Sequence, residues 1–86
     1  MKVTLKVFGY LREYVPEGAL VLELAEDARV GALRQQLAEH ARAHWPGFAV
    51  EGLRACAFAS EHALLREDEA LPADGQLAIL PPVSGG

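Results

Sequence analysis

The chain has 86 residues, 51% of them hydrophobic, and its 12 acidic and 8 basic residues give a formal net charge of -4 at pH 7. This length fits one compact domain. No apolar run approaches the roughly 20 residues that span a bilayer, no secretory signal is visible, and no Lys/Arg cluster could neutralise a row of phosphates. We therefore expect a cytoplasmic protein that binds neither membrane nor nucleic acid.

The first half of the chain predicts a hairpin followed by a helix. Apolar and polar residues alternate over residues 2–8 and 19–24, which is typical of half-buried strands. Between them, residues 9–15 predict at most a short helical turn. It is followed at residues 16–18 by Pro-Glu-Gly, residue types that are common in turns. From residue 30 to 45 the apolar period becomes that of a helix, which Pro46 and Gly47 end.

Three further strands are expected in the second half, over residues 54–59, 64–65 and 76–80. The first is a buried strand of small residues, the second a short edge strand, and the third ends where two prolines follow. The charged run at residues 67–69 predicts a solvated loop. This order of elements indicates an α+β fold, a sheet packed by one main helix.

The last six residues, Pro-Pro-Val-Ser-Gly-Gly, are the most unusual local feature. Two prolines hold the chain extended, and glycines let a backbone pass through a narrow channel and leave the terminal carbonyl open to attack. Such a tail reaches roughly 20 Å beyond the sheet. We therefore divide the chain into a folded domain, residues 1–80, and an extended tail, residues 81–86, whose reactive group is the carboxylate of Gly86.

A carboxylate reacts with nucleophiles only after activation. The chain has no Gly-rich phosphate loop followed by lysine, so ATP would be used by a partner that forms an acyl-adenylate on Gly86. Sulfide added to this mixed anhydride gives a terminal thiocarboxylate. The chain itself is expected to bind no cofactor.

Two segments resemble a known family, the MoaD-type small subunits of molybdopterin synthase. Residues 81–86 are similar to that family's terminal motif at every position, and Phe-Gly-Tyr-Leu-Arg-Glu at residues 8–13 resembles the exit from its first strand. Length and element order agree along the whole chain. The chain departs from the pattern at Ala59-Ser60 and at Gln76-Leu77, where members often have an asparagine and an acidic pair. The resemblance implies a ubiquitin-like β-grasp, in which the last strand lies centrally beside the first.

The resemblance also implies a function as a sulfur carrier. Gly86 would be adenylated by an E1-like enzyme and converted to a thiocarboxylate with sulfur from a donor such as a cysteine desulfurase system. It would then donate sulfur to the pterin precursor, cyclic pyranopterin monophosphate, to form the molybdopterin dithiolene. The tail would enter the large subunit of the synthase, in a heterotetramer of two small and two large subunits. The chain would not be catalytic alone.

A core this small cannot bury all of its large apolar residues, so we expect an exposed patch for partner proteins. The candidates are Phe8, Tyr10, Leu11, Phe58, Ile79 and Leu80. We place the patch on the sheet face around Phe58 and Leu80, near the root of the tail. The predicted partner-binding residues are Pro81, Pro82, Val83, Ser84, Gly85, Phe58 and Leu80.

Other residues with reactive side chains are interpreted as structural. His40 and His44, four residues apart on the helix, could share a metal ion, but a third ligand is not evident, so we predict no metal site. Cys56 lies among small and aromatic residues and is expected to be a buried thiol. Ser84 has no neighbouring base and is better explained as a small residue that fits a channel.

Two other functions stay open. The same fold could serve as a sulfur carrier for thiamine or for tRNA thiolation, or as a ubiquitin-like protein modifier. Thiamine carriers are generally shorter and lack the Pro-Pro pair, which favours the synthase subunit. The second alternative is a non-catalytic β-grasp interaction module with an idle tail, for which deletion of Gly85 and Gly86 would change nothing.

Overall fold

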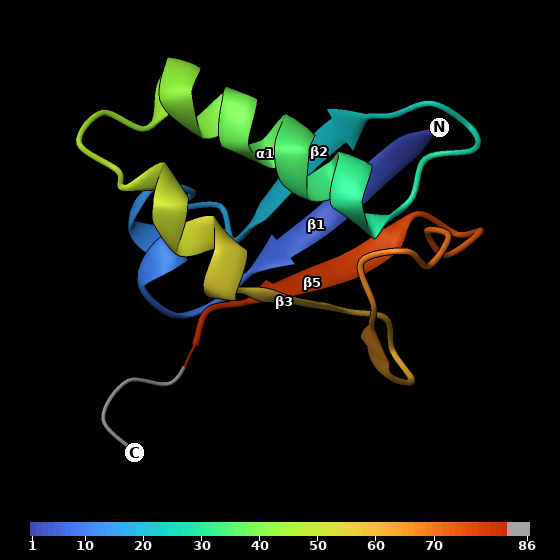
Figure 1. Ribbon diagram of the computed structural model, residues 1–86. Coiled ribbons are helices and arrows are strands. Elements are labelled where there is room, and N and C mark those ends of the chain that lie inside the picture. Colours follow the sequence, from blue (N-terminus) through green and yellow to red (C-terminus); the bar gives the residue numbers. More distant parts are fainter. Residues whose placement is uncertain (83–86) are drawn as a thin grey trace.

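The computed structural model describes residues 1–82, which form a five-stranded mixed sheet with one long helix packed across it (Figure 1). The strands are β1 (Lys2–Val7), β2 (Ala19–Glu23), β3 (Ala57–Ala59), β4 (Leu64–Leu65) and β5 (Gln76–Leu80). The helices are α1 (Val30–His44) and two short 3-10 helices, η1 (Gly9–Glu13) and η2 (Val50–Ala55). No helix within residues 1–82 is long and apolar enough to cross a membrane.

The strand order is β2-β1-β5-β3-β4, so the last strand of the chain lies between the first and the third. β5 pairs in parallel with β1, where Leu5 faces Leu77, and antiparallel with β3, where Phe58 faces Ile79. β1 and β2 form the expected antiparallel hairpin. This arrangement is a β-grasp, and it confirms both the predicted fold class and the central position of the last strand.

The core lies between α1 and one face of the sheet. Alternation along β1 points Val3, Leu5 and Val7 toward the helix, and all three are buried. On α1 the buried residues recur at helical spacing, and they are Val30, Leu33, Leu37 and Ala41. The opposite face of the sheet carries no helix among the described residues. It presents small and polar side chains together with two exposed large ones, Val21 at 55% and Leu64 at 65%.

Gly75 lets the last strand start beside the first. Its φ is +68°, and a Cβ at this position would overlap the carbonyl oxygen of Lys2. Its own carbonyl accepts a hydrogen bond of 2.8 Å from the backbone N–H of Thr4. A residue with a side chain would therefore be strained and would also push β5 away from β1.

The predicted strand over residues 54–59 is only partly correct. Its first half belongs to the 3-10 helix η2, and the strand β3 begins at Ala57. The side chain of Arg34 on α1 explains the difference, because its Nη1 donates to the carbonyl oxygens of Leu53 and Cys56. Through these two hydrogen bonds Arg34 holds residues 53–56 against α1, and the strand begins only at the next residue, Ala57.

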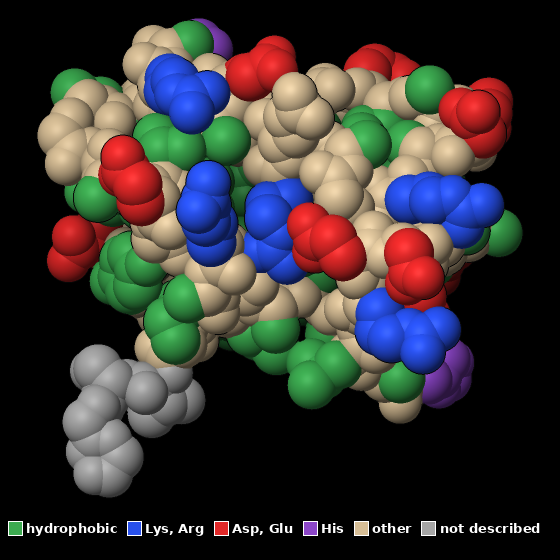
Figure 2. All heavy atoms as spheres, viewed as in Figure 1, with side chains coloured by type: hydrophobic (Ala, Val, Ile, Leu, Met, Phe, Trp, Pro, Cys, Tyr) green, Lys and Arg blue, Asp and Glu red, His purple; other side chains and the backbone are tan. Residues whose placement is uncertain are grey.

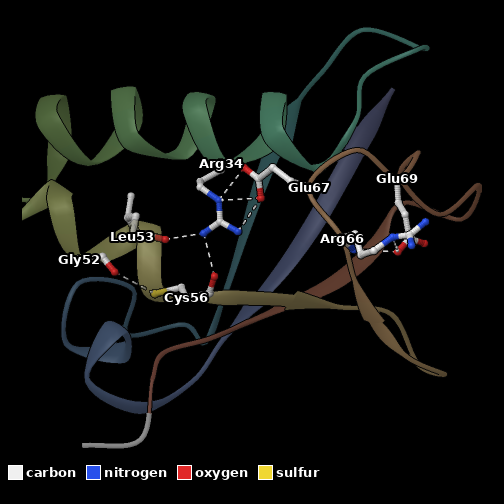
Figure 3. Close-up of polar contacts among 7 residues, drawn as sticks. All are labelled: Arg34, Gly52, Leu53, Cys56, Arg66, Glu67 and Glu69. Atoms are coloured by element: carbon white, nitrogen blue, oxygen red, sulfur yellow. Dashed lines mark hydrogen bonds and ion pairs between the residues drawn. The ribbon is translucent and has the colours of Figure 1, made fainter.

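Arg34 also binds the loop that follows β4 (Figure 3). Its Nε and Nη2 donate to the carboxylate of Glu67, with distances of 3.0 Å to Oε2 and 2.9 Å to Oε1. Its guanidinium carbon lies 4.9 Å from the centre of the Phe58 ring, and the Arg34 side chain is only 18% exposed. One side chain thus joins α1, η2, β3 and the loop after β4.

Replacing Gly75 by alanine should destabilise the protein more than replacing Gly47, which has a similar φ of +80° but no atom of residues 1–82 within 4 Å of an added Cβ. Left-handed φ alone should lower the free energy of unfolding by about 1 kcal/mol in Gly47→Ala. Gly75→Ala adds the overlap with β1, so we expect roughly two to three times that loss. Urea unfolding of both variants measures the difference, and equal losses would contradict the proposed overlap.

Replacing Arg34 by methionine keeps an apolar stem but removes every donor. The carbonyls of Leu53 and Cys56 and the carboxylate of Glu67 then lose their partner, so we expect a loss of about 2–3 kcal/mol in unfolding free energy. The matched control is Arg66→Met, because Arg66 is 81% exposed and its ion pairs should contribute less than about 0.5 kcal/mol. Similar losses in both variants would show that the Arg34 contacts add little.

Candidate functional site

The tail leaves the sheet at the end of β5, where Pro81 packs against η1. Gly9, the first residue of η1, has a φ of +63°, and a Cβ built on it would lie 2.6 Å from Cγ of Pro81. The absence of a side chain at Gly9 therefore makes room for the proline ring. Pro81 is half-buried and Pro82 is exposed, so the described chain turns outward between these two residues. We call the surface of Phe8, Gly9, Tyr10, Leu80 and Pro81 the tail root.

Apolar side chains at the tail root remain accessible. Phe8 is 43% and Tyr10 46% exposed, and Leu80 is half-buried. Two other candidates of the sequence analysis, Leu11 and Ile79, have no exposed surface at all. Of the six candidates, Phe8, Tyr10 and Leu80 thus keep exposed surface, and Tyr10 belongs to η1.

The prediction that Phe58 belongs to the exposed patch is wrong. Phe58 is 1% exposed and lies under Arg34, on the helix side of the sheet. It pairs with Ile79, whereas Leu80 pairs with Ala57 and points to the other face. Because neighbouring residues of a strand alternate between faces, Phe58 and Leu80 cannot share one surface.

The open face of the sheet continues from the tail root as a shallow surface of small side chains. Ala57, Ala59 and Ala78 are half-buried on this face, and Ala59 pairs with Ala78. Beside them is a shallow pocket, which also includes Lys6 and Gln76. Because these side chains are short, the backbone of a partner protein can approach this part of the sheet closely.

The remaining predicted site residues, Val83, Ser84, Gly85 and Gly86, lie outside the described residues. Their expected role in the chemistry stays a prediction. What the structure provides is the position from which this segment starts, fixed by Leu80 in β5 and by the packing of Pro81.

Cys56 is a buried thiol, as expected, and it lies close to the tail root. Its side chain is among the core residues, 3% exposed, and its Sγ is 3.5 Å from the carbonyl oxygen of Gly52. Burial raises the pKa of Cys56, which Arg34 and a hydrogen bond with Tyr10 partly oppose. Burial also raises the pKa of Tyr10, and the neighbouring thiol adds to this effect. The thiol therefore stays protonated near neutral pH and is a poor nucleophile.

The two helix histidines pack against each other at the end of α1. Their ring centres are 4.5 Å apart, and His40 also contacts the edge of Trp45. Burial, and then the charge of His44, lowers the pKa of His40. Among residues 1–82, no three His, Cys, Asp or Glu side chains are placed to hold a metal ion.

The charged run at residues 67–69 is more than a solvated loop. Glu67 binds Arg34, and Glu69 accepts a hydrogen bond from the backbone N–H of Arg66 within the same turn. Arg29 donates to the carbonyl of Asp68. The contacts with Arg34 and Arg29 could not be expected from the sequence, because these partners are more than 30 residues away from the run.

Known proteins of similar sequence or structure share the β-grasp fold described above. The sequence profile of the ThiS family matches residues 5–86, nearly the whole chain. No curated protein matches the chain by sequence.

Solved structures of similar fold cover the chain from end to end. SAMP1 from Haloferax volcanii, a small archaeal modifier protein, is 27% identical over 100% of both chains, with a TM-score of 0.70. A proposed molybdopterin converting factor, subunit 1, from Pyrococcus furiosus is 25% identical over 96% of this chain and 99% of its own, with a TM-score of 0.71. The ubiquitin-like domain of Plasmodium falciparum Dsk2, 20% identical over 95% and 97% of the two chains, shares the fold with a TM-score of 0.61.

The pKa of His40 predicts a pH dependence of stability. Because its pKa in the folded protein lies below the ordinary 6.5, the unfolded chain binds the proton more readily, and stability should fall as the pH drops through that value. His40→Gln should lose less stability than the native protein over this range. Thermal unfolding at a series of pH values measures the effect, with His62→Gln, at an exposed position, as the control. Parallel pH profiles for His40→Gln and the native protein would refute the assignment.

Proposed function

The chain belongs to the ThiS family, and from this we propose that it is a sulfur carrier that works through the carboxylate of Gly86. One observation carries the proposal: the family match extends through residue 86 and so includes the entire tail, Pro81 to Gly86. A plain interaction module would need the sheet and helix but has no use for this ending.

The geometry of the tail root supports the same function. β5 is hydrogen-bonded on both sides, to β1 and to β3, so the segment after it starts from the rigid centre of the sheet. Pro81 is seated on Gly9 and gives the departing chain a fixed direction. A tail anchored in this way can be delivered into the active site of another protein while the folded domain docks outside it.

The chemistry begins with ATP bound by a partner. The Gly86 carboxylate attacks the α-phosphate, pyrophosphate leaves, and an acyl-adenylate results. Sulfide then displaces AMP and leaves a thiocarboxylate, an anionic nucleophile at neutral pH. Its sulfur attacks an electrophilic carbon of the acceptor and displaces an oxygen leaving group from that carbon, which gives a thioester. Water then hydrolyses the thioester, so that the sulfur stays on the product as a thiol and the Gly86 carboxylate is regenerated. The glycine at this position keeps the carbonyl accessible in every step.

We propose molybdopterin synthase as the setting. The large subunit would receive the tail, bind the pterin precursor and assemble with this chain as a heterotetramer of two small and two large subunits. An E1-like enzyme would charge the carrier, with sulfur from a cysteine desulfurase system. The likeness to the Pyrococcus furiosus protein supports this choice. Since the charging step consumes ATP, we place the carrier in the cytoplasm.

The tail root and the open sheet face are the proposed contact surface for these partners. Phe8 and Tyr10 are accessible there, and Leu80 connects them with the small side chains of β3 and β5. Burial of such apolar side chains stabilises a complex by roughly 25 cal/mol per Å². The contact is then next to the tail rather than remote from it.

The likeness to SAMP1 favours one second function, a ubiquitin-like modifier. The same acyl-adenylate would then be transferred to a lysine amine of another protein and form an isopeptide bond with Gly86. Both functions share activation of the carboxylate and differ in the nucleophile that follows.

The tail mechanism can be tested by lengthening the chain by one residue after Gly86 or by making Gly86→Ala. After incubation with ATP, a cognate activating enzyme and sulfide, intact mass should show one oxygen replaced by sulfur in the native protein and in neither variant. Asp27→Ala, an exposed position in the loop after β2, should be charged normally.

The result separates the candidate functions. Charging of the lengthened protein without trimming would refute the tail mechanism. Charging of the native protein, followed by conversion of the pterin precursor with the large subunit, would establish the synthase. Lysine conjugates in place of pterin conversion would establish the modifier.

A further inference from the structure

A second concave surface lies on the helix side of the protein, between α1 and η2. It is a groove of about 560 Å³, and its apolar floor includes Ala38, Phe48 and Val50, all half-buried. Arginine side chains line its rim, namely Arg34, Arg42 and Arg54. We call this surface the basic groove.

The basic groove is locally positive, whereas the protein as a whole is negative. The chain has a net charge of -4, yet three of its six arginines line this groove, with Glu51 as the acidic side chain among them. In Figure 2, Lys and Arg side chains gather over α1 and η2, with hydrophobic atoms between them. Complementary charges of this kind guide an acidic partner to one surface of an otherwise acidic molecule.

Two of the three guanidinium groups are available to a ligand. Arg34 is held by Glu67 and by two backbone carbonyls. Arg42 and Arg54 are exposed and take part in none of the ion pairs within residues 1–82. Arg42 belongs to α1 and Arg54 to η2, so two accessible cations come from the two elements that wall the groove.

We propose that the basic groove binds an extended peptide segment of a partner protein, in which acidic and apolar side chains alternate. Apolar side chains would cover Phe48 and Val50, and carboxylates would meet Arg42 and Arg54. A small free anion fits less well, because it would leave the apolar floor in water. This proposal is independent of the sulfur chemistry of the tail.

The groove lies on the helix side of the sheet, away from the open face. η2 leads directly into β3, and Ala57, three residues after Arg54, pairs with Leu80 at the end of the last strand. The groove itself is walled by α1, which covers the face of the sheet opposite the open one. One protein could therefore hold the carrier through the basic groove while the open face and the tail engage another.

A labelled octapeptide of alternating glutamate and leucine is the probe, with the lysine-leucine octapeptide as its charge control. Fluorescence anisotropy with the full chain should show binding of the acidic peptide only, weaker at higher salt. The double variant Arg42→Glu/Arg54→Glu should bind it at least about tenfold more weakly. Arg12→Glu/Arg66→Glu, which makes the same change in charge at exposed positions outside the groove, should bind like the native protein.

Two further measurements distinguish a peptide groove from a simple anion site. Val50→Ser should weaken binding with little change in its salt dependence, and amide shifts in nitrogen-15 spectra should cluster on α1 and η2. Thermal unfolding of each variant confirms that it is folded. The proposal is overturned by equal binding of the two peptides, by equal weakening in both double variants, by displacement with equimolar pyrophosphate, or by shifts confined to the open sheet face.

Discussion

The double pairing of β5 is the constraint on which the rest of the molecule depends. The last strand of the chain occupies the position between β1 and β3, and its backbone is hydrogen-bonded to β1 on one side and to β3 on the other. Glycines make both ends possible: Gly75 lets the strand enter against the carbonyl of Lys2, and Gly9 leaves room for Pro81 where it exits. The tail therefore starts from the most constrained part of the fold, although its own residues carry the proposed reaction.

A single arginine sets the arrangement on the helix side. Arg34 satisfies the carbonyls of η2, pairs with Glu67 and covers the ring of Phe58, so the long connection from α1 to β3 is held without a disulfide or a metal among the described residues. A partly buried guanidinium bound to several acceptors resists replacement by lysine, which offers a point charge instead of a planar set of donors. Arg34 is occupied by these contacts, whereas Arg42 and Arg54, the other two arginines of the groove between α1 and η2, are exposed to solvent.

Much of the fold could be predicted from the sequence, and the errors have physical causes. Alternation located β1 and β2, and the 3.6-residue period located α1, because in each case one face is buried over several residues. The two prolines that follow residue 80 located the end of β5. The start of β3 was missed because the contacts of Arg34 that shape η2 join residues about 20 positions apart. Phe58 was assigned to the wrong face because three residues of strand do not fix which side is buried. The tail root could be located from the Pro-Pro pair, whereas the basic groove, built from α1 and η2, carries no local signal in the sequence.

A carrier has to bind several proteins in turn and release each of them, and the distribution of its surfaces suits that task. The tail root and open sheet face present modest apolar area, with Phe8 and Tyr10 less than half exposed, rather than the large hydrophobic surface of an obligate interface. The proposed contacts of the basic groove rely on exposed arginines, and rim charges of this kind raise the rate of association more than they slow dissociation. Since the two surfaces lie on different sides of the sheet, a new partner can bind one of them before the previous partner leaves the other.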